Sequence, residues 1–141
     1  MASIVPETSR GQLVAFQFAQ DAVAASQTNV QLVTPGETTT PLTDGYVVPW
    51  PGEVVALTWA LDTAGSAGVF TIGATVGGTE DADTTVTVGT AASGSQKVAR
   101  GLCKFVAGDK IGAEITTDGS WDGTTSDLIV TVWALVYMSG I

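Results

Sequence analysis

The sequence predicts an all-β domain, an antiparallel β-sandwich of about eight or nine strands. The 141 residues are rich in Thr and Val, whose branched side chains favour a pleated strand, and include 17 Gly, which mark turns. Runs of alternating apolar and polar residues recur between turn signals at a spacing of roughly 8–12 residues. The one helix-tolerant run is shorter than two turns, so no helix is available to cover a parallel sheet.

The chain begins with an expected arm and two expected strands. Residues 1–11 are polar and contain Pro and Gly, so we expect an irregular arm, followed by one domain at residues 12–141. Residues 12–20 alternate as a strand does. The helix-tolerant run at residues 21–26 is expected to be a loop or a single turn, and residues 29–33 a short strand.

The middle of the chain contains the clearest hairpin. A loop rich in Pro, Gly and Thr at residues 34–44 leads into a brief strand at residues 46–48, which Pro49-Trp50-Pro51-Gly52 ends. Residues 53–61 form a strong strand, since alternate positions carry large apolar side chains. A turn rich in Gly and Ala separates them from the returning strand at residues 69–76.

Shorter strands follow the hairpin. Residues 77–83 are expected to form an acidic turn and residues 84–88 a strand in which Val alternates with Thr. We expect a loop at residues 89–95, then a strand at residues 96–105. A Gly-Asp turn leads into the next strand, residues 110–116, and a polar loop follows that strand.

The last expected strand, residues 127–138, is apolar on both faces. One face carries Leu128, Val130, Val132, Ala134 and Val136, and the other carries Ile129, Trp133, Leu135 and Tyr137. One face fills the core, but the other leaves a patch of several hundred Å², which monomers rarely expose. We expect further copies of the chain to cover it in a closed symmetric oligomer, and the alternative is cover by the chain's own loops. The expected interface residues are Trp59, Ile129, Trp133, Leu135 and Tyr137.

Composition excludes several classes of function. The chain has no His, so it has no His-dependent catalytic triad and no His metal site, and its one Cys forms no internal disulfide. A net charge of −9 repels phosphate, so nucleic acid and anionic membranes are not expected partners. The first residues lack the pattern of a signal peptide, and no apolar run is long enough to span a bilayer.

Several segments resemble a known superfamily. They are Tyr46-Val47-Val48-Pro49-Trp50-Pro51-Gly52 before a long apolar strand, Gly77-Gly78, Phe105-Val106-Ala107-Gly108-Asp109-Lys110-Ile111, and the apolar aromatic strand from Trp133. This order resembles the jelly roll of the C1q/TNF-like superfamily. It is more similar to the small jelly-roll virion proteins of tailed bacteriophages, which decorate or cement capsids, usually as trimers. The resemblance covers residues 45–141 and rests on turn residues and apolar rhythm.

The resemblance implies a jelly roll and a mechanical function. The chain is then a non-enzymatic virion protein without cofactors, assembled in the host cytoplasm, which binds the outer capsid surface as a homotrimer and bridges copies of the major capsid protein. The expected capsid contacts are Ile4, Val5 and Trp50. One alternative is a C1q-like trimeric head that recognises a glycan or protein ligand, but the signal peptide and collagen stalk usual there are absent from this sequence.

Carboxylates suggest three further sites. Asp62-Thr63-Ala64-Gly65 is similar to the Asp-Thr-Gly of aspartic proteases, which leaves a small carboxylate hydrolase as a second alternative, although an ordinary hairpin turn explains the same residues. The cluster Glu80, Asp81 and Asp83 offers oxygen ligands to Ca²⁺ but suits a solvated turn better. A sugar could stack on Trp121 among the Asp residues 118, 122 and 127, but a Trp tucked against its own domain is the favoured interpretation.

The lone Cys and the clustered cations are two further features of the sequence. Cys103 lies in a strand pattern and is expected to be a small buried hydrophobic residue. Lys97, Arg100 and Lys104 gather most of the positive charge, and they either meet an acidic partner surface or balance the chain's own carboxylates.

Overall fold

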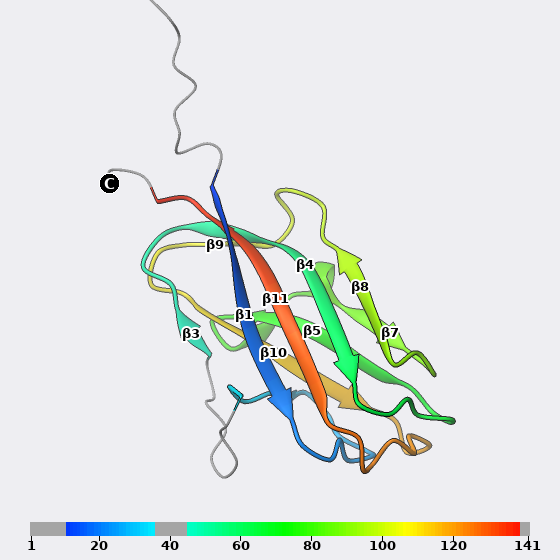
Figure 1. Cartoon of the computed structure of the whole chain (residues 1–141). Helices are drawn as coiled ribbons and strands as arrows, with labels where there is room; N and C mark the ends of the chain where they lie inside the picture. The colour runs from blue at the N-terminus through cyan, green and yellow to red at the C-terminus, as the bar shows by residue number, and fades with distance from the viewer. Residues whose placement is uncertain (1–10, 36–44, 139–141) are drawn as a thin grey trace, which may run out of the picture.

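A computed structural model describes residues 11–35 and 45–138, which form two antiparallel sheets packed face to face (Figure 1). Among these residues the one helical piece is a single 3₁₀ turn at Ala82–Thr84. The all-β class and the sandwich are therefore confirmed. Residues 1–10, which include Ile4 and Val5, lie outside the described part of the chain.

The first sheet has the spatial order β1-β11-β4-β8, with β9 also paired to β4. Its strands are β1 (Gln12–Gln20), β11 (Leu128–Val136), β4 (Gly52–Leu61), β8 (Ser93–Lys97) and β9 (Lys104–Phe105). β11 is hydrogen-bonded to β1 on one side and to β4 on the other, each along nearly its whole length. The last strand of the chain is thus the centre of this sheet.

The second sheet has the order β2-β10-β5-β6, with β3 paired to β10 and β7 paired to β5. Its strands are β2 (Val30–Gln31), β10 (Lys110–Thr117), β5 (Phe70–Val76), β6 (Thr79–Glu80), β3 (Tyr46–Val47) and β7 (Val86–Val88). β4 and β5, expected to be the two arms of a hairpin, are instead in opposite sheets. The loop between them, residues 62–69, carries the chain from one layer to the other.

The core consists of the side chains that the two sheets turn toward each other. Alternate residues of β11, from Leu128 to Val136, are buried as their alternation predicted. They face an equally apolar row on β10 and β5, in which Ile115 pairs with Ile72 and Ala113 with Ala74. Burial of each large apolar side chain contributes about 1.5–3 kcal/mol relative to exposure, so these rows hold the layers together.

The predicted loop at residues 89–95 and the predicted strand at residues 96–105 are both wrong in their bounds. β8 already begins at Ser93, and after Lys97 the chain leaves the sheet before it returns as β9 on the same edge of β4. Gly101 has a φ of +84°, and the Leu102 N–H donates to the Ala99 carbonyl, so a turn interrupts the strand. Leu102, expected in the strand, is 52% exposed.

Other strands differ less from the prediction. β6 lies within the expected acidic turn, and β7 begins two residues late because Thr84 ends the 3₁₀ turn. A break in the register of β4 against β11, between Trp133 and Ala134, places Val54 rather than Val55 in the core. The expected loop at residues 21–26 contains no helix or strand, as predicted.

Candidate functional site

The outer side of the first sheet carries a group of apolar side chains, in which the polar row Gln17, Thr131 and Thr58 separates Ile129 from the rest. Its members, which we call the apolar face, are Leu13, Ala15, Ala56, Ile129, Trp133 and Leu135. The register joins them across strands, since Leu135 pairs with Leu13 and Trp133 pairs with both Ala15 and Ala56. Leu13 is 55% exposed and Ile129 47% exposed. In Figure 1 these strands lie in front of the second sheet, and no described segment crosses over them.

Trp133 is the centre of the apolar face. Its neighbours across the sheet are alanines, so the indole lies among small side chains, and its Nε1–H donates to the Thr58 hydroxyl at 3.0 Å. Beside it is an open hollow of about 400 Å³, lined by Leu13, Val55, Ala56, Thr58, Ser95, Lys97 and Trp133. A rigidly held indole next to an open, mostly apolar hollow suits contact with another protein surface.

The structure brings together most of the expected interface residues. Ile129, Trp133 and Leu135 lie on the apolar face, and Tyr137 lies just beyond the end of β11. Trp59 does not join them, because it pairs with Val130 and points to the inner side of β4. There its ring lies over Gly94, where a Cβ would collide with it. The prediction missed Leu13 and Ala15, which reach this face only through the pairing of β1 with β11.

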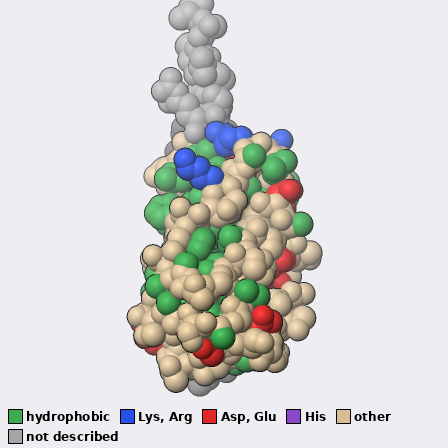
Figure 2. Space-filling model, turned by 90° about the vertical axis from the view of Figure 1, so that its right-hand side faces the viewer, with side chains coloured by type: hydrophobic (Ala, Val, Ile, Leu, Met, Phe, Trp, Pro, Cys, Tyr) green, Lys and Arg blue, Asp and Glu red, His purple; other side chains and the backbone are tan. Residues whose placement is uncertain are grey.

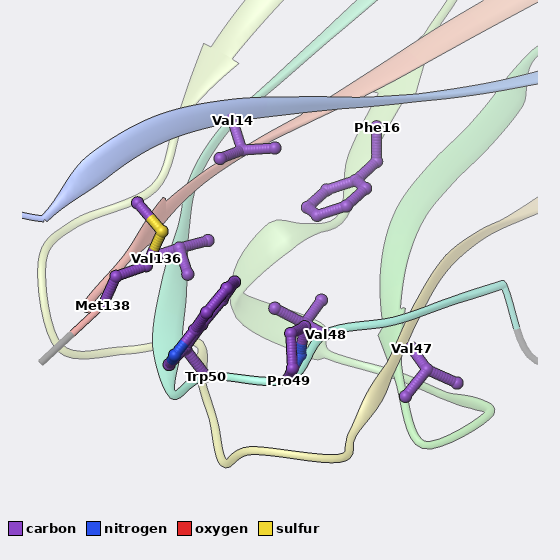
Figure 3. A pocket seen from close by; sticks show the side chains of 8 residues that line it. All are labelled: Val14, Phe16, Val47, Val48, Pro49, Trp50, Val136 and Met138. Atoms are coloured by element: carbon purple, nitrogen blue, oxygen red, sulfur yellow. The ribbon is translucent and has the colours of Figure 1, made fainter. Parts of the chain in front are cut away.

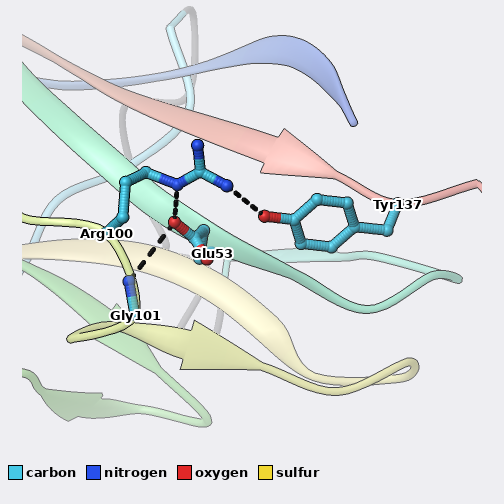
Figure 4. A network of polar contacts seen from close by, with 4 residues as sticks. All are labelled: Glu53, Arg100, Gly101 and Tyr137. Atoms are coloured by element: carbon cyan, nitrogen blue, oxygen red, sulfur yellow. Dashed lines mark hydrogen bonds and ion pairs between the residues drawn. The ribbon is translucent and has the colours of Figure 1, made fainter. Parts of the chain in front are cut away.

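A polar network closes one end of the apolar face (Figure 4). Glu53 pairs with Leu135 in the register, yet the side chain of Glu53 is only 7% exposed because Arg100 covers it. Arg100 forms an ion pair with Glu53 through Nε and donates from Nη2 to the Tyr137 hydroxyl at 2.8 Å. The Gly101 N–H also donates to Glu53, at 3.4 Å.

This network fixes the ionisation of Glu53. Burial by itself raises the pKa of the Glu53 carboxyl, but hydrogen bonds from Arg100 and the Tyr137 hydroxyl, with the charge of Arg100, hold that pKa below its ordinary value. The same contacts raise the pKa of Arg100. The pair therefore remains charged at neutral pH, with the guanidinium held in one orientation.

An apolar pocket of about 180 Å³ lies between β1 and the segment formed by β3 and the residues after it (Figure 3). It is lined by Val14, Phe16, Val47, Val48, Pro49, Trp50, Val136 and Met138. Trp50, expected to contact the capsid, is partly buried and packs against the core, with its ring facing the pocket. Its position is that of a lid on the end of the sandwich.

The carboxylates at the opposite end hold loops together. Asp62 accepts from the Asp127 N–H at 2.9 Å, and Asp127 accepts from the Ala22 N–H at 2.9 Å. Asp122 accepts from the N–H groups of Ser66 and Ala67, and these bonds, with one from the Ser66 hydroxyl, lower its pKa. Asp62 therefore joins its own loop to the loop that precedes β11 through the backbone of Asp127, rather than closing a hairpin turn as the sequence suggested.

Trp121 is tucked into its own domain, as favoured by the sequence. It is 3% exposed, its Nε1–H donates to the Val23 carbonyl at 3.1 Å, and its ring meets Phe70 edge-on at 5.2 Å. A Cβ at Gly65 or Gly123 would collide with the ring. No aromatic face is left there for a sugar.

The remaining candidate site residues, Cys103 and the acidic cluster around Asp81, serve the fold. Cys103 is fully buried, as expected, though it lies in the segment before β9, and burial, with the charge of Asp81, raises its pKa to about 12. Asp81 caps the 3₁₀ turn by accepting from the Asp83 N–H. Among the described residues, no group of three or more Cys, Asp or Glu is placed to hold a metal ion.

No protein-family model matches the chain, and no curated protein matches it in sequence. In the described part of the chain, no helix has both the length and the apolar character needed to cross a bilayer.

We predict that Trp121→Ala lowers the free energy of unfolding by about 3–5 kcal/mol, because it removes a buried aromatic ring and leaves a cavity. Urea denaturation followed by fluorescence or circular dichroism measures this change. Leu102→Ala, at an exposed position, is the control and should change stability by less than about 0.5 kcal/mol. Equal effects of the two variants would contradict the packing described.

We predict that Glu53→Gln lowers stability by about 1–2 kcal/mol at neutral pH, since it removes a charge-assisted network. The lowered pKa of Glu53 means that its contribution is complete above the ordinary value of 4.5 and is lost as the pH falls below that value. The difference between wild type and variant should therefore shrink in acid. Urea titrations from pH 7 to pH 3 test this, and a difference independent of pH would refute it.

Proposed function

We propose that this chain is a non-enzymatic virion structural protein, a capsid decoration protein that binds the outer shell as a homotrimer and bridges capsomers. The apolar face of the first sheet is the observation that carries this proposal. It is central in the sheet, rigid, and left uncovered by the described chain, and apolar patches of this kind mark interaction sites. A second copy of the same surface is the simplest cover in a closed oligomer.

The path of the chain supports the jelly-roll resemblance from which the trimer is inferred. The chain crosses repeatedly between the layers, as it does from β4 in the first sheet to β5 in the second and from β10 in the second to β11 in the first. Jelly rolls join two sheets by repeated crossings of this kind. The interface residues in the proposed trimer are Ile129, Trp133, Leu135 and Tyr137, together with Leu13 and Ala15.

The proposed role is mechanical. A trimer that touches several capsomers at once holds them by avidity, which exceeds single-site affinity by roughly 10²–10⁴. The major capsid protein is the proposed partner, and the outer capsid surface the proposed location. Ile4, Val5 and Trp50 remain the proposed capsid contacts, with Trp50 contributing at the rim of its pocket.

We predict that the protein has three times the 14.3 kDa chain mass in solution. Trp133→Ala should weaken assembly by more than about 2 kcal/mol, since central interface aromatics dominate association. Ile129→Ser should act in the same direction with little effect on the monomer, because about half of Ile129 is exposed, 47%. Light scattering across a dilution series measures both effects.

Val69→Ser is the matched control, because Val69 is 38% exposed and lies outside the apolar face. It should leave the mass unchanged. A monomeric wild type at micromolar concentration would overturn the trimer, and an oligomer unaffected by Trp133→Ala would remove the apolar face as its interface.

We also predict that deletion of residues 1–11 lowers affinity for shells roughly tenfold or more, since it removes Ile4 and Val5, while the domain stays folded. Cosedimentation with shells that lack this protein measures the affinity, and thermal unfolding checks the domain. Unaltered binding would rule the arm out as a contact. Binding to glycans alone, with no affinity for shells, would instead support the recognition head.

A further inference from the structure

One end of the sandwich presents exposed apolar side chains on two neighbouring turns. Leu102 lies in the turn between β8 and β9 and is 52% exposed. Val106 lies in the turn before β10 and is 65% exposed. Neither side chain belongs to the core, and a polar residue would serve either turn equally well. We call the surface formed by residues 97–106 the basic end.

The cations of the chain gather on the same surface. Residues 97–110 contain four of the five Lys and Arg in the sequence, in a protein whose net charge is −9. Figure 2 shows Lys and Arg side chains together at one end of the molecule, and Asp and Glu along one side and toward the other end. The loops of that other end, residues 21–29, 62–69 and 118–127, contain five Asp and no Lys or Arg.

The two ends differ in their cations, although carboxylates accept hydrogen bonds from the backbone at both, as Asp109 does from the Val106 N–H at 2.8 Å. The carboxylates of the acidic end accept hydrogen bonds from backbone N–H groups, as Asp62, Asp118 and Asp122 do. At the basic end, within the part of the chain that the structure describes, the ammonium groups of Lys97 and Lys104 make no ion pair. The fold therefore does not need these two charges.

Arg100 adds a preorganised donor to the basic end. Glu53 and Tyr137 orient its guanidinium, yet its side chain remains 60% exposed. An arginine held in this way has N–H groups free to donate to a carboxylate at small entropic cost. Exposed Leu and Val beside an oriented Arg, a residue type enriched at interfaces, and two unpaired Lys offer a partner both apolar contact and positive charge.

We propose that the basic end is the surface by which this protein docks on a carboxylate-bearing, partly apolar surface of another protein. The inference rests on the proposed function, under which that partner is the outer surface of the major capsid protein. Charge complementarity orients the molecule, with its acidic loops away from the shell. Gly11, to which residues 1–10 are joined, packs against Tyr137 near this end, so the arm starts where the docking surface lies.

Cosedimentation with empty shells of the major capsid protein tests the proposal. Leu102→Ser/Val106→Ser and Lys104→Gln should each lower affinity roughly tenfold or more, whereas Val69→Ser at the acidic end should leave it unchanged. Wild-type affinity should fall as salt rises, and Lys104→Gln should make that dependence shallower. Light scattering and thermal unfolding should show that all variants keep the wild-type mass and stability.

The outcomes separate this inference from the proposed function. Wild-type protein that binds no shells overturns the proposed function and this partner together. Shells that bind the wild type and the double variant equally overturn the basic end alone. Vesicles of phosphatidylcholine with phosphatidylserine are the second probe: binding of the wild type to them, lost in the double variant, would show a lipid surface as the partner and overturn the protein partner.

Discussion

The structure depends on β11, a strand that is hydrogen-bonded on both edges and apolar on both faces. Its pairing with β1 joins the start of the chain to its end, and its pairing with β4 extends the sheet toward β8. The inner side chains, from Leu128 to Val136, fill the core. Since side chains alternate along a strand, this packing leaves Ile129, Trp133 and Leu135 on the outside in fixed positions. The core thus determines the surface that is proposed to bring subunits together.

The two ends of the sandwich differ in how their polar groups are satisfied. At the acidic end, carboxylates of one loop accept hydrogen bonds from the backbone of another, as Asp62 does from Asp127, so charge serves the fold. At the basic end, one buried carboxylate, Glu53, orients Arg100, while Lys97 and Lys104 stand outside that network. The unpaired cations therefore lie at one end of the strands and the carboxylates that join loops lie at the other. An assembly that buries the apolar face on the side of each sandwich would still leave its loop ends free for a second partner.

The turn at residues 98–103 connects the basic end with the strands of the apolar face. It interrupts the edge strand beside β4, carries Arg100 over Glu53, and exposes Leu102. Because Arg100 also donates to Tyr137, which follows β11, the turn is tied to the end of the central strand. Assembly through the apolar face would therefore act directly on the contacts that orient Arg100.

The sequence alone determined the all-β class, the position of most strands and the inner row of β11, because alternation of apolar residues is a local property of the chain. It also indicated that Cys103 and Trp121 are buried. It did not reveal that Trp59 points inward, nor that Leu13 and Ala15 complete the apolar face, since strand register joins residues far apart in the chain. The network of Glu53, Arg100 and Tyr137 unites three distant segments. Only the tertiary structure decided these features, because they depend on which strands pair and on where a turn breaks the ladder.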